Sequence, residues 1–464
     1  AKTFGLPKYE IDAMVKNYGE SIFGDAVKIP DKIARSIYSY GGYLHGNPNY
    51  LIIHAGGILL SDKPIYYYTA THLPPKGFAT TQFDMHVAED IGLYKFDILS
   101  QRGLGHIKEA VEIVKANKGI DIDITPVEQF KKDPLLNQNL LKGNTIGCFY
   151  IESPAMRSLL NKLLCDNYLT LVAASSIIRP GVAQSGMMDE YIRRHRFPEH
   201  RKKIHPVMGD IMPDTYGVMV YQEDVIKVAH YFAKLTLSEA DVLRRGMSGK
   251  SRSKDEFQRI KQKFHANCTD LNYSKELIAD VWHQIESFAG YSFAKGHSAS
   301  YAVESYQSLY LKTYYPLEFM VAVVNNFGGF YTAELYLHEA KKAGAHIEAP
   351  CINKSNYTTC IYGTVIYVGF IHITGLENNV AERILAERLA NGPFVDFDDF
   401  MMRVVINLEQ LEILITINAF RISGIKKREL LIEAYRRLNK SKKTQPAATL
   451  FHTGAPTPYQ FPEL

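Results

Sequence analysis

The stretch Ile91-Gly-Leu-Tyr-Lys-Phe-Asp-Ile-Leu99 carries the feature around which the rest of the sequence is interpreted. Its aromatic and aliphatic residues predict a buried or half-buried β-strand. Alternate side chains of a strand share one face, so Lys95 and Asp97 point one way and the apolar residues beside them point the other way. A carboxylate can bind a divalent cation while a lysine faces phosphate oxygens. The alternative is an ordinary ion pair on an exposed strand.

Two stretches before this one also predict strands. Leu51–Leu60 is an apolar strand pair interrupted by Gly56 and Gly57, and Thr80–Asp84 is a shorter strand candidate. Two glycines inside apolar strand sequence indicate a tight turn or the close approach of another backbone. We therefore expect a small sheet that carries Asp97.

The composition is that of an ordinary globular chain of about two to four domains, with 464 residues, 46% of them hydrophobic and 22% charged. No apolar run reaches the length of a membrane span and no signal peptide opens the chain, so we expect a cytoplasmic protein without a membrane partner. The five cysteines are scattered, which fits a reducing compartment and argues against a structural zinc site. Because the first residue is Ala1 rather than Met, we expect a piece of a longer polypeptide.

The net charge of +4 conceals three strongly basic stretches, Arg193–Lys203, Arg244–Lys263 and Arg421–Lys443. A basic stretch is usually a solvated surface. Three of them in a nearly neutral chain favour a polyanionic partner.

The middle of the chain has a mainly helical pattern, with a strand or extended loop expected at Gly143–Glu152. Ser238-Glu-Ala-Asp241 predicts a capping box, and its helix places Arg244 and Arg245 near the far end. The Gly/Ser loop that follows contains Lys250 and can wrap phosphates with amides and basic side chains. It lacks the Walker pattern, so the sequence does not support a P-loop ATPase.

Phe288–Tyr301 is dense in small and aromatic residues and contains Lys295 and His297. One interpretation is a close-packed junction of helices. The other is a surface for nucleotide or template, on which aromatic rings stack on bases and Lys295 meets phosphate.

Two stretches after about residue 345 resemble helix-hairpin-helix elements. In the first, a strand within Val365–Leu376 leads into a helix over Glu377–Leu389, whose N-terminal amides can face a phosphate. In the second, Leu411–Ala419 and Lys426–Leu438 flank a Ser-Gly turn. The residues from Ser441 onward are rich in Pro, Thr and Lys and predict a linker.

Many short motifs of the chain, in the same order, resemble those of the alpha subunit of bacterial DNA polymerase III, the C-family replicative polymerases. The resemblance covers nearly the whole chain and is weakest after about residue 440. The motifs are His54-Ala-Gly-Gly, Thr81-Gln-Phe-Asp, Lys95-Phe-Asp-Ile-Leu, Gly147-Cys-Phe-Tyr-Ile-Glu-Ser, Arg179-Pro-Gly, Ser185-Gly-Met-Met-Asp, Tyr216-Gly-Val-Met-Val-Tyr-Gln-Glu, Leu243-Arg-Arg-Gly-Met, Phe288-Ala-Gly-Tyr-Ser-Phe-Ala-Lys-Gly-His-Ser-Ala and Tyr315-Pro-Leu-Glu-Phe-Met.

The resemblance implies an α+β fold that is mostly helical, with a small palm sheet, large helical fingers and a helix-hairpin-helix region. The implied domains are a thumb-like part over residues 1–50, the second part of the palm over 51–105, fingers over 106–345, a duplex-binding helix-hairpin-helix region over 346–440 and a linker over 441–464.

The resemblance also implies roles for single residues. Asp97 matches the third catalytic, metal-binding carboxylate. The implied nucleotide-binding residues are Lys95, Arg179, Arg244 and Arg245, and the Gly/Ser loop adds Lys250. The candidate DNA-binding residues are Lys295, His297, Lys426, Lys427 and Arg428.

The implied activity is that of a DNA-directed DNA polymerase, a nucleotidyltransferase of DNA replication that adds dNTPs to a primer 3′-hydroxyl with two Mg²⁺ ions. The implied partners are primer-template DNA, dNTPs and other replicase subunits. The sequence departs from the family in Ser100–Leu104 and at Tyr150, and it contains no Pro-Asp-x-Asp-x-Asp-Phe segment, which carries the family's other two carboxylates. We therefore expect a fragment that begins after those carboxylates and is inactive alone. The alternative is a non-catalytic, DNA-binding accessory paralogue.

The sequence Ala447-Ala-Thr-Leu-Phe451 resembles the family's short peptide that binds the sliding clamp. Leu450 and Phe451 are in place, but Ala447 stands where a Gln is expected. We expect weak binding to the sliding clamp, or packing of Phe451 against the helical region.

Overall fold

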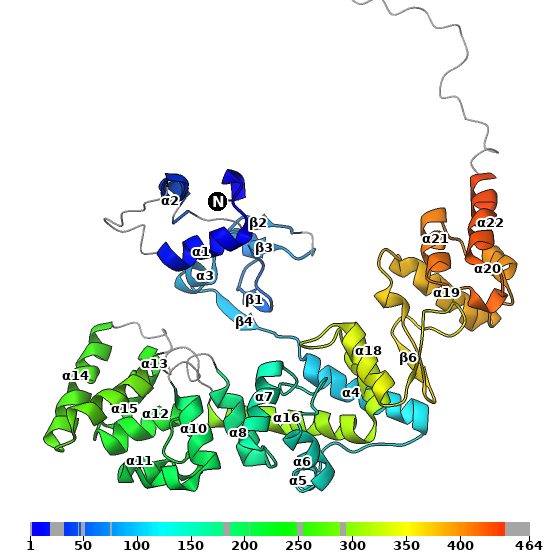
Figure 1. Ribbon diagram of the computed structural model, residues 1–464. Coiled ribbons are helices and arrows are strands. Elements are labelled where there is room, and N and C mark those ends of the chain that lie inside the picture. The colour runs from blue at the N-terminus through cyan, green and yellow to red at the C-terminus, as the bar shows by residue number, and fades with distance from the viewer. Residues whose placement is uncertain are drawn as a thin grey trace, which may run out of the picture. The chain divides into compact units, whose positions relative to one another are not determined.

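The computed structural model describes residues 2–18, 32–44, 46–47, 52–74, 77–179, 186–203, 205–247, 254–287 and 294–440 (Figure 1). The chain divides into two compact units, Ala1–Ser100 and Gln101–Leu464. The fold is α+β and mostly helical, as expected. No helix among the described residues is both long and apolar enough to cross a membrane.

The described residues of the first unit form short strands and three α-helices. Its elements are α1 (Lys8–Tyr18), α2 (Lys32–Leu44), β1 (Gly57–Leu60), β2 (Thr71–His72), β3 (Thr80–Thr81), α3 (Met85–Asp90) and β4 (Tyr94–Asp97), with 3-10 turns at Lys2–Phe4 and Ile65–Tyr67. β1 and β4 are antiparallel, with Gly57 opposite Asp97 and Leu59 opposite Lys95. The predicted sheet that carries Asp97 is therefore present.

Three details of that prediction are wrong. Strand structure begins only at Gly57, so Leu51–Leu60 is not a strand pair within the described residues. The strand at Thr80 pairs with β2 in a separate sheet. β4 is exposed rather than buried, since Tyr94 and Phe96 retain 73% and 53% of their accessible surface. A described sheet of two strands leaves the apolar face of β4 open.

The helical part of the second unit surrounds α16, a 20-residue helix (Lys295–Tyr314). α16 packs against α4 (Arg102–Lys118), α6 (Pro134–Leu141) and α8 (Tyr168–Ile177), and α17 (Pro316–Asn325) packs against α4 and α18 (Ala333–Lys342). The other described elements of this helical part are α5 (Val127–Phe130), α7 (Pro154–Leu163), α10 (Met187–Arg196), α11 (Pro206–Ile211), α12 (Gln222–Lys227), a π-helical turn (Val228–Phe232), α13 (Leu237–Met247), α14 (Lys254–Asp270) and α15 (Lys275–Ser287), with 3-10 turns at Pro198–Lys203 and Pro213–Thr215.

Two local predictions in this part are wrong. Residues 143–152 form turns rather than a strand or an extended loop, and Gly147 and Tyr150 have φ angles of 84° and 63° there. The capping box of α13 lies two residues before the predicted one, because Thr236 and Glu239 exchange the capping hydrogen bonds. Asp241 is thereby free of a capping role.

Glu152 organises the turn at residues 143–152 from a buried position. Its carboxylate accepts the N–H groups of Gly147 at 2.8 Å and Phe330 at 2.6 Å, and the Tyr336 hydroxyl at 2.9 Å. A buried carboxylate is stable when several donors surround it. Glu152 therefore connects the turn before α7 to the loop before α18.

The C-terminal part has a three-stranded sheet and a second hydrophobic core. The strand order is β5-β7-β6, with β5 parallel and β6 antiparallel to β7. The strand predicted within Val365–Leu376 and the helix predicted over Glu377–Leu389 are both present. The elements are β5 (His346–Glu348), β6 (Cys360–Tyr362), β7 (Val365–Tyr367), α19 (Asn378–Asn391), α20 (Phe397–Arg403), α21 (Leu408–Thr416) and α22 (Lys427–Lys440), with 3-10 turns at Phe370–His372 and Arg421–Ser423.

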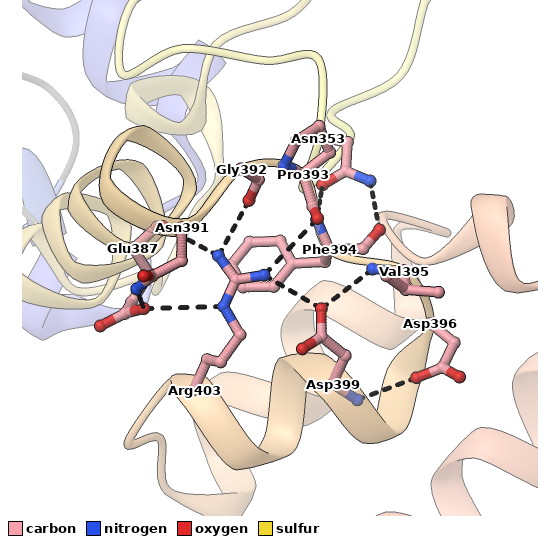
Figure 2. Close-up of polar contacts among 10 residues, drawn as sticks. All are labelled: Asn353, Glu387, Asn391, Gly392, Pro393, Phe394, Val395, Asp396, Asp399 and Arg403. Carbon is pink, nitrogen blue, oxygen red and sulfur yellow. Dashed lines mark hydrogen bonds and ion pairs between the residues drawn. The ribbon is translucent and has the colours of Figure 1, made fainter.

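Arg403 holds the loop between α19 and α20 (Figure 2). Its guanidinium donates to the carbonyl oxygens of Glu387 and Gly392, both at 2.8 Å. It also lies 4.3 Å from the centre of the Phe394 ring. The side-chain amide of Asn353 then pairs with both the N–H and the C=O of Phe394, each at 2.8 Å. The loop is fixed by polar contacts that involve its own backbone.

Glu152→Gln is expected to lower the free energy of unfolding by about 1–3 kcal/mol, because a side-chain NH₂ would face groups that donate hydrogen bonds. Denaturant unfolding of both the variant and the unchanged chain measures this difference. Glu276→Gln, on an exposed position of α15, is the matched control and is expected to change little. Equal stability of the two variants would contradict the role of Glu152.

Candidate functional site

Lys95 and Asp97 form a close ion pair on one face of β4. Lys95 Nζ lies 2.6 Å from Asp97 Oδ1 and 2.8 Å from Oδ2. The hydrogen bond from Lys95 is the main reason that the pKa of Asp97 lies below its usual value. The Asp97 side chain is 48% exposed, whereas that of Lys95 is only 14% exposed. The sheet thus presents an ionised, accessible carboxylate with a lysine beside it.

Gly56 and Gly57, at the start of β1, lie next to this ion pair and are hydrogen-bonded to His54. His54 Nδ1 accepts hydrogen bonds from the N–H groups of Gly57 at 2.6 Å and Gly56 at 3.1 Å. Since Nδ1 accepts these hydrogen bonds, it carries no proton. His54 and Asp97, whose Nδ1 and Oδ1 atoms are 3.8 Å apart, therefore do not form an ion pair.

Neither glycine has room for a side chain. A Cβ on Gly56 would lie 2.4 Å from the Ile98 carbonyl oxygen, and one on Gly57 would lie 2.8 Å from His54 Nδ1 and 3.1 Å from Lys95 Cε. The expected close approach of another backbone is confirmed at Gly56.

This face presents the carboxylate of Asp97 to solvent. Within the described residues, no group of three or more His, Cys, Asp or Glu side chains is placed to hold a metal ion. The exposed Asp97 carboxylate is nevertheless suited to be one ligand, because carboxylate oxygens are preferred by hard divalent cations. A cation bound to Asp97 would compete with Lys95, whose ammonium would then be available to an anionic group.

Arg244 and Arg245, near the end of α13, share one carboxylate. Asp241 Oδ1 accepts from Arg244 at 2.8 and 3.0 Å, and Asp241 Oδ2 lies 2.9 Å from Arg245. The Arg245 side chain is 57% exposed. Sequence reasoning assigned Asp241 to a cap and missed this role, although its spacing of three and four residues from the arginines indicates such pairs. Lys250 lies outside the described residues.

The structure brings Arg179 and His297 to one aromatic cluster. The Arg179 guanidinium lies 5.8 Å from the Tyr150 ring centre. The Tyr301 ring lies 4.9 Å from that of Tyr150 and 4.1 Å from that of His297. Burial, and then the charge of Arg179, lower the pKa of His297, so the ring is neutral at physiological pH. Tyr301 is a member of this cluster that sequence reasoning did not select as a site residue.

Lys295 occupies a different environment. Its Nζ lies 3.0 Å from Asp214 and 5.5 Å from the Tyr221 ring centre, and its backbone N–H donates to Glu223 at 2.9 Å. Glu223 thereby accepts from the first residue of α16. A phosphate at Lys295 would have to compete with Asp214.

Many basic residues of the three charged stretches make internal contacts, so these stretches are not simply solvated surfaces. Arg194 donates to the Tyr216 carbonyl at 2.7 Å, and Arg201 stacks 4.0 Å from the Tyr216 ring centre. Arg421 donates to the carbonyls of Ala349 at 2.8 Å and Pro350 at 2.9 Å. Arg201 also donates to the Arg194 carbonyl at 2.7 Å. The guanidinium groups of these three arginines are therefore already hydrogen-bonded to backbone oxygens.

The three candidate duplex-binding residues at the start of α22 differ from one another. Lys427 donates to the Thr416 carbonyl at 2.8 Å. Lys426 and Arg428 are exposed, and their side chains make no hydrogen bond or ion pair within the described part of the chain. Lys426 and Arg428 are therefore the better placed to meet phosphate. Leu450 and Phe451 lie outside the described residues.

Comparison with known families places two models and one motif along the chain. The model of the bacterial DNA polymerase III alpha NTPase domain matches residues 2–100. The model of the bacterial DNA polymerase III alpha subunit finger domain matches residues 103–272. A helix-hairpin-helix motif matches residues 344–430.

Two curated proteins illustrate the similarity over longer stretches. DNA polymerase III subunit alpha of Staphylococcus aureus (strain COL) is 36% identical over 398 residues, which are 84% of this chain and 36% of the relative. DNA polymerase III subunit alpha of Aquifex aeolicus (strain VF5) is 33% identical over 392 residues, 84% of this chain and 33% of the relative. The chain spans about a third of the length of these relatives.

Gly56→Ala is expected to separate β4 from the turn before β1, since the new Cβ would collide with the backbone oxygen of Ile98. The amide of Ile98, which donates to the Gly56 carbonyl at 2.7 Å, should then exchange its hydrogen faster. Hydrogen exchange followed by mass spectrometry or NMR measures this. Gly42→Ala in α2, where a Cβ meets no atom within 4 Å, is the control. Unchanged exchange at Ile98 in Gly56→Ala would refute the close approach.

Proposed function

Because this chain belongs to the family of bacterial DNA polymerase III alpha subunits, we propose that it acts as part of a DNA-directed DNA polymerase. In this reaction the primer 3′-hydroxyl attacks the α-phosphorus of a dNTP, the new phosphodiester bond forms, pyrophosphate leaves, and the hydroxyl proton passes to a base or to water. The observation that carries the proposal is the ion pair of Lys95 and Asp97 on one face of the β1–β4 sheet, where Gly56 and Gly57 allow the chain before β1 and the end of β4 to approach closely.

Asp97 contributes one ligand for the divalent cations, which we expect to be two Mg²⁺ ions. When bound, such ions stabilise the charge of the attacking and leaving oxygens. Lys95 turns from Asp97 to the phosphate oxygens of the nucleotide. The other carboxylates of the metal site are expected to come from outside these 464 residues. Since the chain covers about a third of its relatives, this division of the site is consistent with the comparison.

The nucleotide triphosphate is expected to meet the arginines of the second unit. Arg244 and Arg245 exchange Asp241 for phosphate oxygens, with which guanidinium groups form strong paired hydrogen bonds. Arg179 and Lys250 are the further nucleotide-binding candidates. Lys295 and His297 are proposed to contact DNA beside the aromatic cluster, whose rings can stack on bases.

Duplex DNA behind the primer end is proposed to bind the helix-hairpin-helix region through Lys426, Lys427 and Arg428. This region, the fingers over residues 106–345, the palm part over 51–105 and the thumb-like part over 1–50 are the domains we propose. Leu450 and Phe451, in the linker over 441–464, remain candidates for weak binding to the sliding clamp, alongside contacts with other replicase subunits. A cytoplasmic location fits the five cysteines, none of which forms a disulfide.

One observation favours a second function, that of a DNA-binding accessory paralogue without catalysis. Within the described residues, Asp97 belongs to no group of three or more potential metal-binding side chains. The presence or absence of two further metal-binding carboxylates in the complete polypeptide distinguishes the two functions.

Asp97→Asn in the complete polymerase is expected to slow single-turnover primer extension at least about a hundredfold, because a metal ligand contributes several kcal/mol to the transition state. Affinity for primer-template should remain, since the basic residues proposed for duplex binding are elsewhere in the sequence. Asp90→Asn, an exposed carboxylate at the end of α3, is the control. Extension at the unchanged rate by Asp97→Asn would exclude the proposed role, whatever its DNA affinity.

Asp241→Asn is expected to tighten nucleotide binding severalfold, because it removes the carboxylate that competes with phosphate for both arginines. Arg244→Ala and Arg245→Ala should weaken it by about tenfold or more, the cost of a lost charge-assisted hydrogen bond. Titration of a nucleotide in single-turnover extension measures all three. If Asp241→Asn weakens binding as much as the arginine variants do, Asp241 positions the arginines instead of competing for them.

A further inference from the structure

Asn117, in the last turn of α4, uses its whole side-chain amide in hydrogen bonds. Its Nδ2 donates to Glu318 Oε1 at 2.7 Å and to the Gly363 carbonyl at 3.0 Å. Its Oδ1 accepts the N–H of Gly363 at 2.7 Å. The amide therefore pairs with both polar groups of one backbone residue, and a fully buried carboxylate takes its second hydrogen.

Asn325, at the end of α17, repeats this arrangement. Its Nδ2 donates to Glu109 Oε1 at 2.6 Å and to the Thr359 carbonyl at 3.0 Å, and its Oδ1 accepts the N–H of Thr359 at 2.7 Å. Burial raises the pKa of Glu109 while the hydrogen bonds from Asn325 and Asn326 oppose that rise. We call the two arrangements, at Asn117 and at Asn325, the asparagine bridges.

The asparagine bridges hold the two ends of one short strand. Thr359 directly precedes β6, and Gly363 directly follows it. The two asparagines come from α4 and α17, which pack against each other. Two separate residues of the helical part thus fix the position of β6 along its length.

The hairpin of β6 and β7 joins the two hydrophobic cores of the second unit. Ile361 and Ile366 belong to the core formed by the helices around α16. Ile352 and Phe370, on either side of the hairpin in sequence, belong to the core of the helix-hairpin-helix region. A shift of β6 relative to α4 and α17 would therefore change the orientation of one core relative to the other.

We propose that Asn117 and Asn325 are positioning residues that fix the helix-hairpin-helix region to the fingers, so that duplex bound by the first orients the second. The duplex part of this inference rests on the proposed function. A side-chain amide suits the task because it donates and accepts at one site with almost no freedom of geometry. An aspartate of the same shape would oppose carboxylate to carbonyl and to Glu109 or Glu318.

The first test is hydrogen exchange of the complete polymerase and of its Asn117→Asp, Asn325→Asp and doubly substituted variants. Faster exchange at Thr359, Gly363 and the β6–β7 hairpin, with α16 still protected, is expected. Asn267→Asp is the control, because Asn267 donates to the Ala233 carbonyl at 2.8 Å wholly within the fingers. Unchanged exchange at Thr359 and Gly363 in the double variant overturns the proposal. If an Asp variant does not fold, the uncharged Asn325→Ser replaces it.

The second test compares affinity for primer-templates with a long and a short duplex. The unchanged protein should bind the primer-template with the longer duplex more tightly than the one with the shorter duplex. In the double variant, this gain, expressed as the ratio of the two affinities, should be about tenfold smaller, a typical coupling between two sites. Asn267→Asp should keep the gain. Fast exchange at β6 with the full gain retained overturns the positioning role. If the unchanged protein shows no gain, the proposed duplex binding fails, and the positioning role fails with it.

Discussion

The pairing of a side-chain amide with both polar groups of one backbone residue is the constraint on which the C-terminal half of the structure depends. It occurs at Thr359, at Gly363 and, through Asn353, at Phe394. Short strands and loops leave N–H and C=O groups without a regular partner. Such unpaired groups would be costly at Thr359 and Phe394, which are buried, whereas Gly363 is exposed. Asparagine satisfies both at once, at the two ends of β6 through Asn325 and Asn117 and in the loop between α19 and α20 through Asn353.

The two carboxylates Glu152 and Asp97 lie in opposite environments, one buried and one exposed. Glu152 is a carboxylate surrounded by donors in the interior, and its role is to hold loops together. Asp97 is a half-exposed carboxylate on an exposed sheet, and its oxygens accept hydrogen bonds from the neighbouring Lys95. The close approach of Gly56 to Ile98 fixes where Asp97 stands, while its oxygens stay open to solvent. Such a group can accept a cation, and it leaves most of the coordination sphere to other residues.

The sequence allowed the local features of this site to be predicted and left the long-range ones unpredictable. The shared face of Lys95 and Asp97 follows from the two-residue period of a strand, and the close approach at Gly56 follows from paired glycines. The contacts of Arg194, Arg201 and Arg421 with backbone oxygens do not follow from charge alone, because the partners depend on how helices pack. Asn117 and Gly363 are 246 residues apart, and no local pattern connects them.

The claim that Asp97 is a ligand in a polymerase metal site is tested most directly by counting bound ions. Mn²⁺ can be titrated into the complete polymerase loaded with a chain-terminated primer-template and the complementary nucleotide, with bound and free Mn²⁺ measured by electron paramagnetic resonance. The account predicts two tightly bound ions for the unchanged protein, the loss of at least one in Asp97→Asn and no loss in Asp90→Asn. Two ions bound with unchanged affinity in Asp97→Asn would contradict it.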